Sequence, residues 1–147
     1  MNQPFNCHSI QEEGISTQEW IAQTQAHRSS YRRLAKKIVH FYPLDVGRVL
    51  DYGCGNGMLT SLLSDLWPRN VFLDGVDIDH ELIAWANSRF ASERLRFMPL
   101  ENVMNVSAQY DLVVSSFVCH HWDDPKAYFV ELLRLTKPGA SIYVEDI

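Results

Sequence analysis

Apolar side chains recur with the period of a helix in the first third of the chain. Residues 16–19 have the spacing of a capping box, in which a Ser and a Glu three positions later bond each other's backbone N–H groups, and this predicts a short helix that ends near His27. From Tyr31 to Tyr42 the apolar residues are three or four positions apart, so a second helix has one apolar face. We predict an N-terminal helical segment, or lid, over residues 1–45.

After residue 45 the pattern changes to short apolar runs that alternate with helix-period segments. This alternation is typical of α/β proteins, in which buried parallel strands are connected by helices. The predicted strands are Val49–Asp51, Phe72–Asp77, Leu95–Met98, Tyr110–Ser115 and Ser141–Ile147. Helices are predicted over Met58–Trp67, after Asp79 and after Asp124. The sequence predicts a Rossmann-like, doubly wound, mostly parallel sheet with helices on both faces, over residues 46–147.

The composition fits one globular domain. Of the 147 residues, 46% are hydrophobic and 21% are charged, and this balance excludes a disordered chain or a coiled coil. No apolar run is long enough for a membrane span, and the first residues lack the pattern of a signal peptide, so we expect a soluble, cytoplasmic protein. Cys7, Cys54 and Cys119 are far apart and form no metal-ligand motif, so we expect reduced thiols and no metal site.

Charge is distributed unevenly along the chain. Residues 1–48 carry six Lys or Arg and four Asp or Glu, whereas residues 49–147 carry seven and fourteen, and the net charge is −5. Because nucleic-acid binding needs a basic face over most of a domain, we expect no nucleic-acid partner. One basic cluster on the predicted second helix is either a solvated face or a contact for an anion or substrate. It consists of Arg28, Arg32, Arg33, Lys36 and Lys37.

The most informative segment is a glycine-rich turn between the first predicted strand and the helix that follows. Gly53, Gly55 and Gly57 allow a tight turn and a close approach of the backbone to a ligand. Asp77 ends the next predicted strand, 20 residues after the last of these glycines, where a carboxylate can accept hydrogen bonds from both hydroxyls of a ribose. The two strand ends together predict a nucleoside site.

Asp51, two residues before the first glycine, indicates which nucleoside. A carboxylate at this position repels a pyrophosphate, which would have to lie on the helix N-terminus, but attracts an ammonium or sulfonium group. The turn therefore favours a positively charged nucleoside over a dinucleotide such as NAD.

These motifs resemble those of the class I S-adenosylmethionine-dependent methyltransferases, in particular the small-molecule branch of the ubiquinone and menaquinone biosynthesis type. The matching segments read VLDYGCGNG, GVDIDHELIAWA, YDLVVSSFVCHHWDDP and LLRLTKPGASIYVED, and the resemblance covers about residues 31–147. It implies S-adenosylmethionine as cofactor and methyl transfer to a small-molecule acceptor by in-line displacement. This chemistry requires alignment of donor and acceptor rather than a nucleophilic side chain.

The resemblance also implies a set of cofactor contacts. They are Asp51, Gly53 and Gly55 at the methionine, Asp77 at the ribose, Ile78 at the adenine, Leu100, Glu101 and Asn102 at the adenine edge, and Ser115, Ser116 and Phe117 near the reactive methyl. The family more often has Gly-Asp-Ala in place of residues 100–102. Cys54, inside the turn, suits tight packing.

Three further residues have two interpretations each. Tyr31 either lies over the cofactor or fills the apolar helix face. His120 and His121 follow the fourth predicted strand, where a histidine can take a proton from the acceptor, or they serve packing and loop support, as this pair largely does in the resembling family.

The chain differs from the family in its length. The family sheet has seven strands, ordered 3-2-1-4-5-7-6, and this sequence stops at the fifth, so the last two strands are absent and an apolar edge with Ile142 and Val144 is expected to be exposed. Either the sequence is a fragment of a longer enzyme, or another chain covers the edge, for example in a homodimer. Two alternatives stay open: a non-catalytic methyltransferase-like binding or assembly module, and a less favoured NAD-type oxidoreductase.

Overall fold

The computed structural model describes residues 9–10 and 12–146. Its helices are α1 (Thr17–Ala26), α2 (Arg28–Phe41), α3 (Met58–Leu66), α4 (His80–Phe90) and α5 (Pro125–Leu135), with two 3-10 helices, η1 (Leu100–Val103) and η2 (Cys119–His121). Its strands are β1 (Gly47–Tyr52), β2 (Val71–Asp77), β3 (Leu95–Pro99), β4 (Tyr110–Ser116) and β5 (Thr136–Glu145). The expectations for Cys7 and for the strand end at Ile147 lie outside the described residues.

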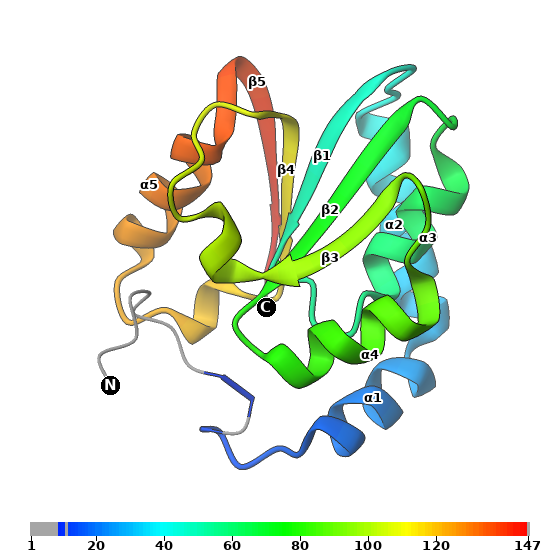
Figure 1. Cartoon of the computed structure of the whole chain (residues 1–147), viewed down its shortest axis with the longest axis vertical. Helices are drawn as coiled ribbons and strands as arrows, with labels where there is room; N and C mark the ends of the chain where they lie inside the picture. Colours follow the sequence, from blue (N-terminus) through cyan, green and yellow to red (C-terminus); the bar gives the residue numbers. More distant parts are fainter. Residues whose placement is uncertain (1–8, 11, 147) are drawn as a thin grey trace.

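The five strands form one parallel sheet in the order β3-β2-β1-β4-β5 (Figure 1). This is the predicted α/β, Rossmann-like class, and the prediction is confirmed. Because all strands run the same way, their carboxyl ends meet along one edge of the sheet, near the C label in the middle of Figure 1. The glycine turn follows β1 at this edge.

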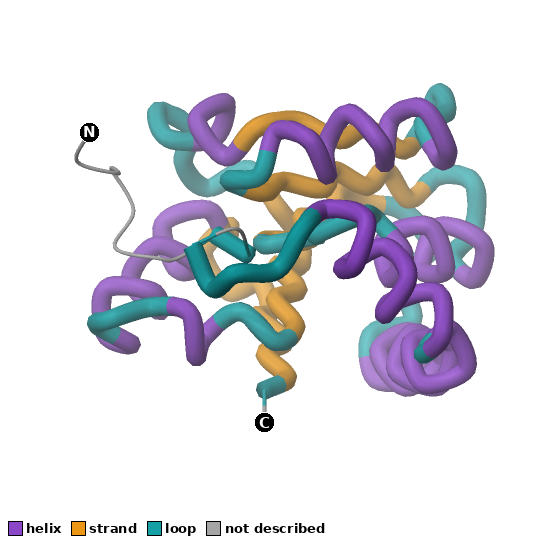
Figure 2. The backbone as a smooth tube through the Cα atoms, turned by 90° about the horizontal axis from the view of Figure 1, so that it is seen from below, coloured by secondary structure: helices purple, strands orange, loops and turns teal. Residues whose placement is uncertain are grey.

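Helices cover both faces of the sheet, because alternate residues of each strand point to opposite sides (Figure 2). On one side, α2, α3 and α4 bury apolar residues against side chains such as Val49 and Leu112. On the other side, α5 and η1 bury theirs against Leu50 and Val113. The neighbouring residues of β1 and of β4 thus belong to two different halves of the core.

Strand β5 begins earlier than predicted. The predicted strand starts at Ser141, after Lys137, Pro138 and Gly139, but Thr136 already pairs with Tyr110 of β4. The register shifts after this pair, and the shift accommodates the proline and the glycine. Ion pairing between Lys137 Nζ and Asp111 Oδ1, 3.0 Å apart, holds the irregular part to β4.

The expected apolar edge is less exposed than the sequence suggested. Ile142 and Val144 are half-buried and pack against the α5 half of the core, so the expectation that they are exposed was wrong. Within residues 9–10 and 12–146, β5 pairs only with β4 and is an edge strand. Pairing of this edge with a second copy stays a prediction. No helix of the described part is long and apolar enough to cross a membrane.

Helix α1 and the residues before it cross the carboxyl edge of the sheet (Figures 1 and 2). The predicted capping box is present: Glu19 N–H donates to Ser16 Oγ (3.1 Å), and Ser16 N–H donates to a Glu19 carboxylate oxygen (3.2 Å). Thr17 Oγ1 donates to Glu81 Oε2 of α4 (2.7 Å). We call residues 9–26 the N-terminal strap, with residue 11 outside the described part.

Candidate functional site

The glycine turn has a backbone that other residues would not adopt without strain. Gly53 and Gly55 have φ values of 80° and 57°. The backbone N–H of Gly53 donates to the carbonyl of Val76 in β2 (2.8 Å), so the turn folds back over the neighbouring strand. A β-carbon at Gly53 would collide with the side chain of Val118, and one at Gly55 would stand 3.0 Å from Nε1 of Trp20. The glycines therefore leave room for side chains, and for a ligand, directly above the turn.

Asp77 organises this turn from the end of β2. Its Oδ2 accepts the N–H of Gly55 (2.9 Å), and its Oδ1 accepts the N–H of Asp79 (2.9 Å). Burial raises its pKa to about 6, and the negative charge of Asp79 adds to the rise, while these two hydrogen bonds and His121 oppose it. The carboxylate is fixed in place but incompletely compensated.

Asp51 lies beside it at the end of β1, only 2% exposed. Its Oδ2 accepts one hydrogen bond from Thr60 Oγ1 (2.7 Å). Burial raises its pKa to about 7, the Thr60 hydrogen bond opposes the rise, and the charge of Asp77 adds to it. A buried carboxylate whose pKa is raised further by a second carboxylate beside it forms a site that favours a positive charge.

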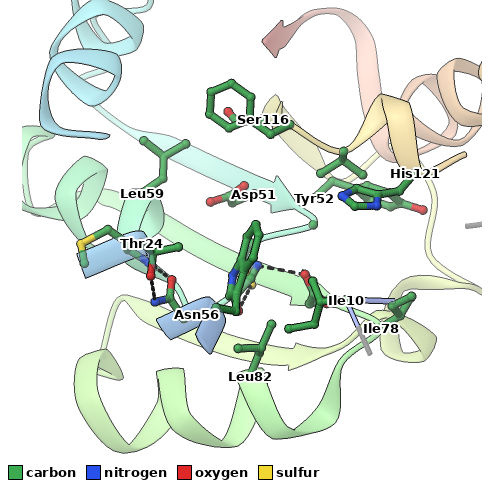
Figure 3. Close-up of a pocket in the computed structure, with 18 of the residues that line it drawn as sticks. Ile10, Thr24, Asp51, Tyr52, Asn56, Leu59, Ile78, Leu82, Ser116 and His121 are labelled. Carbon is green, nitrogen blue, oxygen red and sulfur yellow. Dashed lines mark hydrogen bonds between the residues drawn. The ribbon is translucent and has the colours of Figure 1, made fainter. Parts of the chain in front are cut away.

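A cavity opens between these strand ends and the N-terminal strap (Figure 3). Asp51 and Asp77 line it, and no Lys or Arg is among its described lining residues. Thr24 of α1 accepts a hydrogen bond from the Asn56 amide in the glycine turn, so the strap is attached to the cavity wall (Figure 3). The cavity can attract an ammonium or sulfonium group and offers no cation to a pyrophosphate.

The N-terminal strap forms one wall of this space. Ile10 and Trp20 project into the lining, and the remaining volume is about 90 Å³. Ligand pockets are typically about 300 to 1,000 Å³, so the closed cavity is too small for a nucleoside. The indole N–H of Trp20 is buried with no hydrogen-bond partner in the described part of the molecule, and this weakens the closed arrangement.

Most of the residues predicted for the cofactor site line this cavity. They are Tyr31, Asp51, Gly53, Cys54, Gly55, Asp77, Ile78, Leu100, Ser116 and Phe117. Burial raises the pKa of the Cys54 thiol well above its usual value, as do the charges of Asp77 and Asp51, so the thiol is uncharged at neutral pH. The arrangement brings together residues from β1, β2, β4 and two helices.

Three predicted cofactor residues do not line it. The Glu101 carboxylate faces His80 instead, with Nε2 and Oε1 3.2 Å apart, and Asn102 is exposed. The Ser115 hydroxyl is buried under the site and donates to the carbonyl of Tyr52 (2.8 Å). The side of the cavity expected to address the adenine edge is therefore apolar, with Ile78, Leu82 and Leu100.

The two histidines differ in their surroundings. His121 lines the cavity, and its Nδ1 is 2.6 Å from Glu13 Oε1 of the strap. His120 does not line it, and its Nδ1 is 2.8 Å from Asp146 Oδ1 after β5. The pair thus joins η2 to both ends of the described chain, and only His121 can reach a ligand in the cavity.

The sequence analysis missed the contribution of the strap. Four residues of the strap line the cavity and were not singled out: Ser9, Ile10, Trp20 and Thr24. The available signal was Trp20, the only aromatic residue in a helix that is otherwise weakly apolar. Such a residue usually has a buried partner, but the pattern of a short helix does not say where. No group of three or more His, Cys, Asp or Glu that could hold a metal occurs among residues 9–10 and 12–146.

A parallel sheet with this strand order, a glycine turn after its first strand and an acid at the end of the next are features typical of nucleotide-binding α/β domains. Residues 24–147 match the family model of the methyltransferase domain. The chain belongs to this family, and its resemblance to the class I S-adenosylmethionine-dependent methyltransferases is confirmed.

Curated relatives are longer than this chain. The mitochondrial ubiquinone biosynthesis O-methyltransferase of Dictyostelium discoideum is 32% identical over 129 residues, which is 78% of this chain and 39% of that protein. The malonyl-(acyl-carrier protein) O-methyltransferase of Acetivibrio thermocellus is 30% identical over 103 residues, 67% of this chain and 36% of that protein. The chain spans about two fifths of the length of these relatives.

Solved structures share the fold. A SAM-dependent methyltransferase from Aquifex aeolicus superposes with a TM-score of 0.64 at 20% identity, covering 80% of this chain and 71% of that one. The plantazolicin methyltransferase BpumL, solved with a desmethyl substrate analogue and SAH, gives a TM-score of 0.67 at 21% identity, covering 92% and 53%.

Proposed function

We propose that the chain is the cofactor-binding core of an enzyme that transfers a methyl group from S-adenosylmethionine to a small-molecule acceptor. The observation that carries the proposal is a pair of carboxylates, the buried Asp51 and the partly buried Asp77, which line one cavity that contains no Lys or Arg among its described residues. This charge fits a nucleoside with a cationic tail. The relatives named as methyltransferases and the BpumL structure solved with SAH support it.

The residues of the chain would contribute position and charge. When bound, S-adenosylmethionine supplies a methyl group on a positively charged sulfur, and the electron pair of the broken C–S bond stays on the sulfur as the acceptor atom bonds to the carbon. Asp77 accepts hydrogen bonds from the ribose hydroxyls, and Asp51 attracts the cationic methionine end. The rings of Tyr31 and Phe117 exclude water from the reacting atoms. Alignment of this kind can lower a barrier by about 7 to 11 kcal/mol.

The N-terminal strap acts as the lid in this proposal. Its side-chain hydrogen bonds to the body include those of Glu13, Thr17 and Thr24, which reach three different elements around the cavity. Each is a single exchangeable hydrogen bond, worth about 0.5 to 1.5 kcal/mol, or more where charged. The strap can therefore withdraw to admit the nucleoside and close again over it.

His121 is the candidate proton acceptor of the predicted histidine pair, because it lines the cavity and His120 does not. An acceptor atom that carries a proton must lose it to a base, and a neutral imidazole can take it. A catalytic His121 gives a pH–rate profile that changes in His121→Gln and stays the same in His120→Gln. Equal profiles in both variants would assign the pair to loop support.

Isothermal titration with S-adenosylmethionine, S-adenosylhomocysteine and NAD tests the binding part. We expect the first two to compete for one site and NAD to bind at least 100-fold more weakly. NAD binding of equal strength would instead support an oxidoreductase. Turnover is tested by incubating the protein with S-adenosylmethionine and a small-molecule cell extract and measuring S-adenosylhomocysteine. Binding without any product from the full-length protein would support the non-catalytic module.

A further inference from the structure

A second cavity, of about 440 Å³, shares two aromatic residues with the first. Tyr31 of α2 and Phe117 after β4 line both cavities. Their rings are in edge-to-face contact, with centroids 6.4 Å apart and planes at 84°. The two rings are thus the partition between a cavity sized for a small organic molecule and the cavity with the carboxylates.

The backbone of Phe117 has a strained conformation. Its φ of 60° lies in the left-handed region, which bulky residues rarely adopt. Its backbone N–H donates to the carbonyl of Glu145 in β5 (2.7 Å), which fixes this conformation. Strained backbone that is maintained by a specific contact is typical of functional sites. Here the strained residue is the one that places a ring between the two cavities.

The second cavity has the opposite charge character to the first. Arg33 and Lys37 line it, against one carboxylate, Glu145. That carboxylate is already engaged: Lys37 Nζ lies 3.3 Å from its Oε2, and the Tyr143 hydroxyl donates to the same oxygen (2.6 Å). The balance of the lining is therefore positive.

Arg33 is the cation of this cavity that does not pair with Glu145. Its guanidinium makes a long hydrogen bond to Ser30 Oγ (3.4 Å) and has no carboxylate within ion-pair distance in residues 9–10 and 12–146. In a chain with a net charge of −5, an unpaired guanidinium at the rim of a cavity is suited to bind an anion. The floor beside it is apolar, with Leu34 and the two partition rings.

We propose that the second cavity binds the methyl acceptor, and that the acceptor is a small organic acid whose carboxylate pairs with Arg33. Its apolar body would pack on Leu34 and the rings of Tyr31 and Phe117, and these two rings would have to part for its reacting atom to meet the methyl group of the donor. The inference deepens the proposed methyl transfer and rests on it, because the cationic donor would occupy the other side. Of the two interpretations of the basic cluster, a substrate contact therefore applies to Arg33.

The test uses two probes of nearly equal shape, 3-phenylpropionate and the neutral 3-phenylpropionamide. Their binding is measured by ligand-observed NMR and calorimetry with S-adenosylhomocysteine at saturation. We expect the acid to bind at least tenfold more tightly than the amide in the unchanged protein. Arg33→Gln should weaken the acid at least tenfold and leave the amide unaffected.

Arg32→Gln is the matched control, because Arg32 is exposed on the same helix and does not line the cavity. It should leave both probes unaffected, and thermal melts verify that each variant is folded. Equal binding of acid and amide, or an equal loss in both arginine variants, would overturn the inference. A failure of the unchanged protein to bind S-adenosylhomocysteine would count against the proposed function itself, whereas normal nucleoside binding with no role of Arg33 would refute only the anionic acceptor.

Discussion

Asp51 and Asp74 are buried aspartates on adjacent strands of one sheet, with very different neighbours. Asp74, in β2, lies toward the amino ends of the neighbouring strands and accepts hydrogen bonds from Arg48 (3.0 Å), Arg96 (3.0 Å) and the Tyr110 hydroxyl (2.8 Å). Asp51, at the carboxyl end of β1, accepts one from a neutral threonine. The charge of Asp74 is compensated by two arginines of the protein itself, whereas Asp51 has only a neutral hydrogen-bond donor and can still bind a cationic ligand.

The hydrogen-bond partners alone distinguish an aspartate that stabilises the fold from one that is suited to bind a ligand. A buried charge that is paired and hydrogen-bonded is stable in the folded protein, and an unpaired one shifts its pKa or binds a counter-charge. Asp51 and Asp77 both have raised pKa values at the edge of the sheet where the strands end. Stability and ligand affinity should therefore respond in opposite ways to substitutions in the two regions.

The largest effect is expected from Asp51→Asn at high pH. The pKa of Asp51 is raised in the folded state from 3.8 to about 7, so the folded protein holds a proton that the unfolded chain releases near pH 4. The free energy of unfolding therefore falls as pH rises from about 4 to 7, and the Asn variant escapes this loss. Urea denaturation should find the variant more stable by up to about 4 kcal/mol at pH 8 and equal near pH 4.

Asp74→Ala should act in the opposite direction. Removing this carboxylate leaves the Tyr110 hydroxyl and two half-exposed arginines without their acceptor, and the free energy of unfolding should fall by about 2 to 3 kcal/mol. Affinity for S-adenosylmethionine should not change. Asp65→Ala, on an exposed position of α3, serves as control and should alter neither quantity. A parallel loss of affinity in Asp74→Ala would erase the distinction between the two regions.

Asp77→Ala should reduce affinity rather than stability. Loss of hydrogen bonds between a charged group and the ribose costs about 1.5 to 3 kcal/mol, or about 10- to 150-fold in Kd. Calorimetric titration of the folded variant measures this. Unchanged affinity would mean that the ribose is held elsewhere.

Nucleoside binding should also depend on pH. A cationic ligand binds the ionised carboxylates, and their pKa values of about 6 and 7 mean that protons compete with it in weakly acidic solution. Affinity should rise about tenfold from pH 6 to pH 8 and then level off. The dependence should become shallower in Asp51→Asn, and an equally steep one there would assign the titration to another group.

The smallest effect concerns the strap above these acids. Trp20→Phe removes the buried, unpartnered N–H and keeps most of the ring, so the closed strap gains about 1 kcal/mol and S-adenosylmethionine binds about 2- to 5-fold more weakly. Trp85→Phe, on α4 outside the cavity lining, is the control. Tighter binding in Trp20→Phe would show that the indole N–H is a ligand contact.

The sequence was sufficient to predict the sheet and the two strand-end acids, because these follow from apolar periodicity and from the shared edge of parallel strands. It did not predict which way single side chains point. Ser115 and Ser116 were assigned to the site together, but neighbouring residues of a strand face opposite sides, and only Ser116 lines the cavity. Glu101 was also predicted for the site but does not line the cavity, because η1 directs its carboxylate to His80.

Long-range placement was the other failure. The run from Lys137 to Gly139 has the composition of a break, but pairing of Thr136 with Tyr110 outweighs that local preference. Three hydrogen bonds attach the strap to residues between 32 and 108 positions away. The apolar pattern of a short helix does not predict such distant partners.

A single residue, His27, separates α1 from α2. It ends the first helix and begins the second, no side-chain hydrogen bond caps the helix there, and it lines the second cavity. A strap that swings about this residue opens the nucleoside cavity and at the same time displaces part of the wall of the other. In kinetic terms, the two ligands would bind in a compulsory order: the nucleoside enters while the second cavity is incomplete, and the acceptor follows once the hinge has returned.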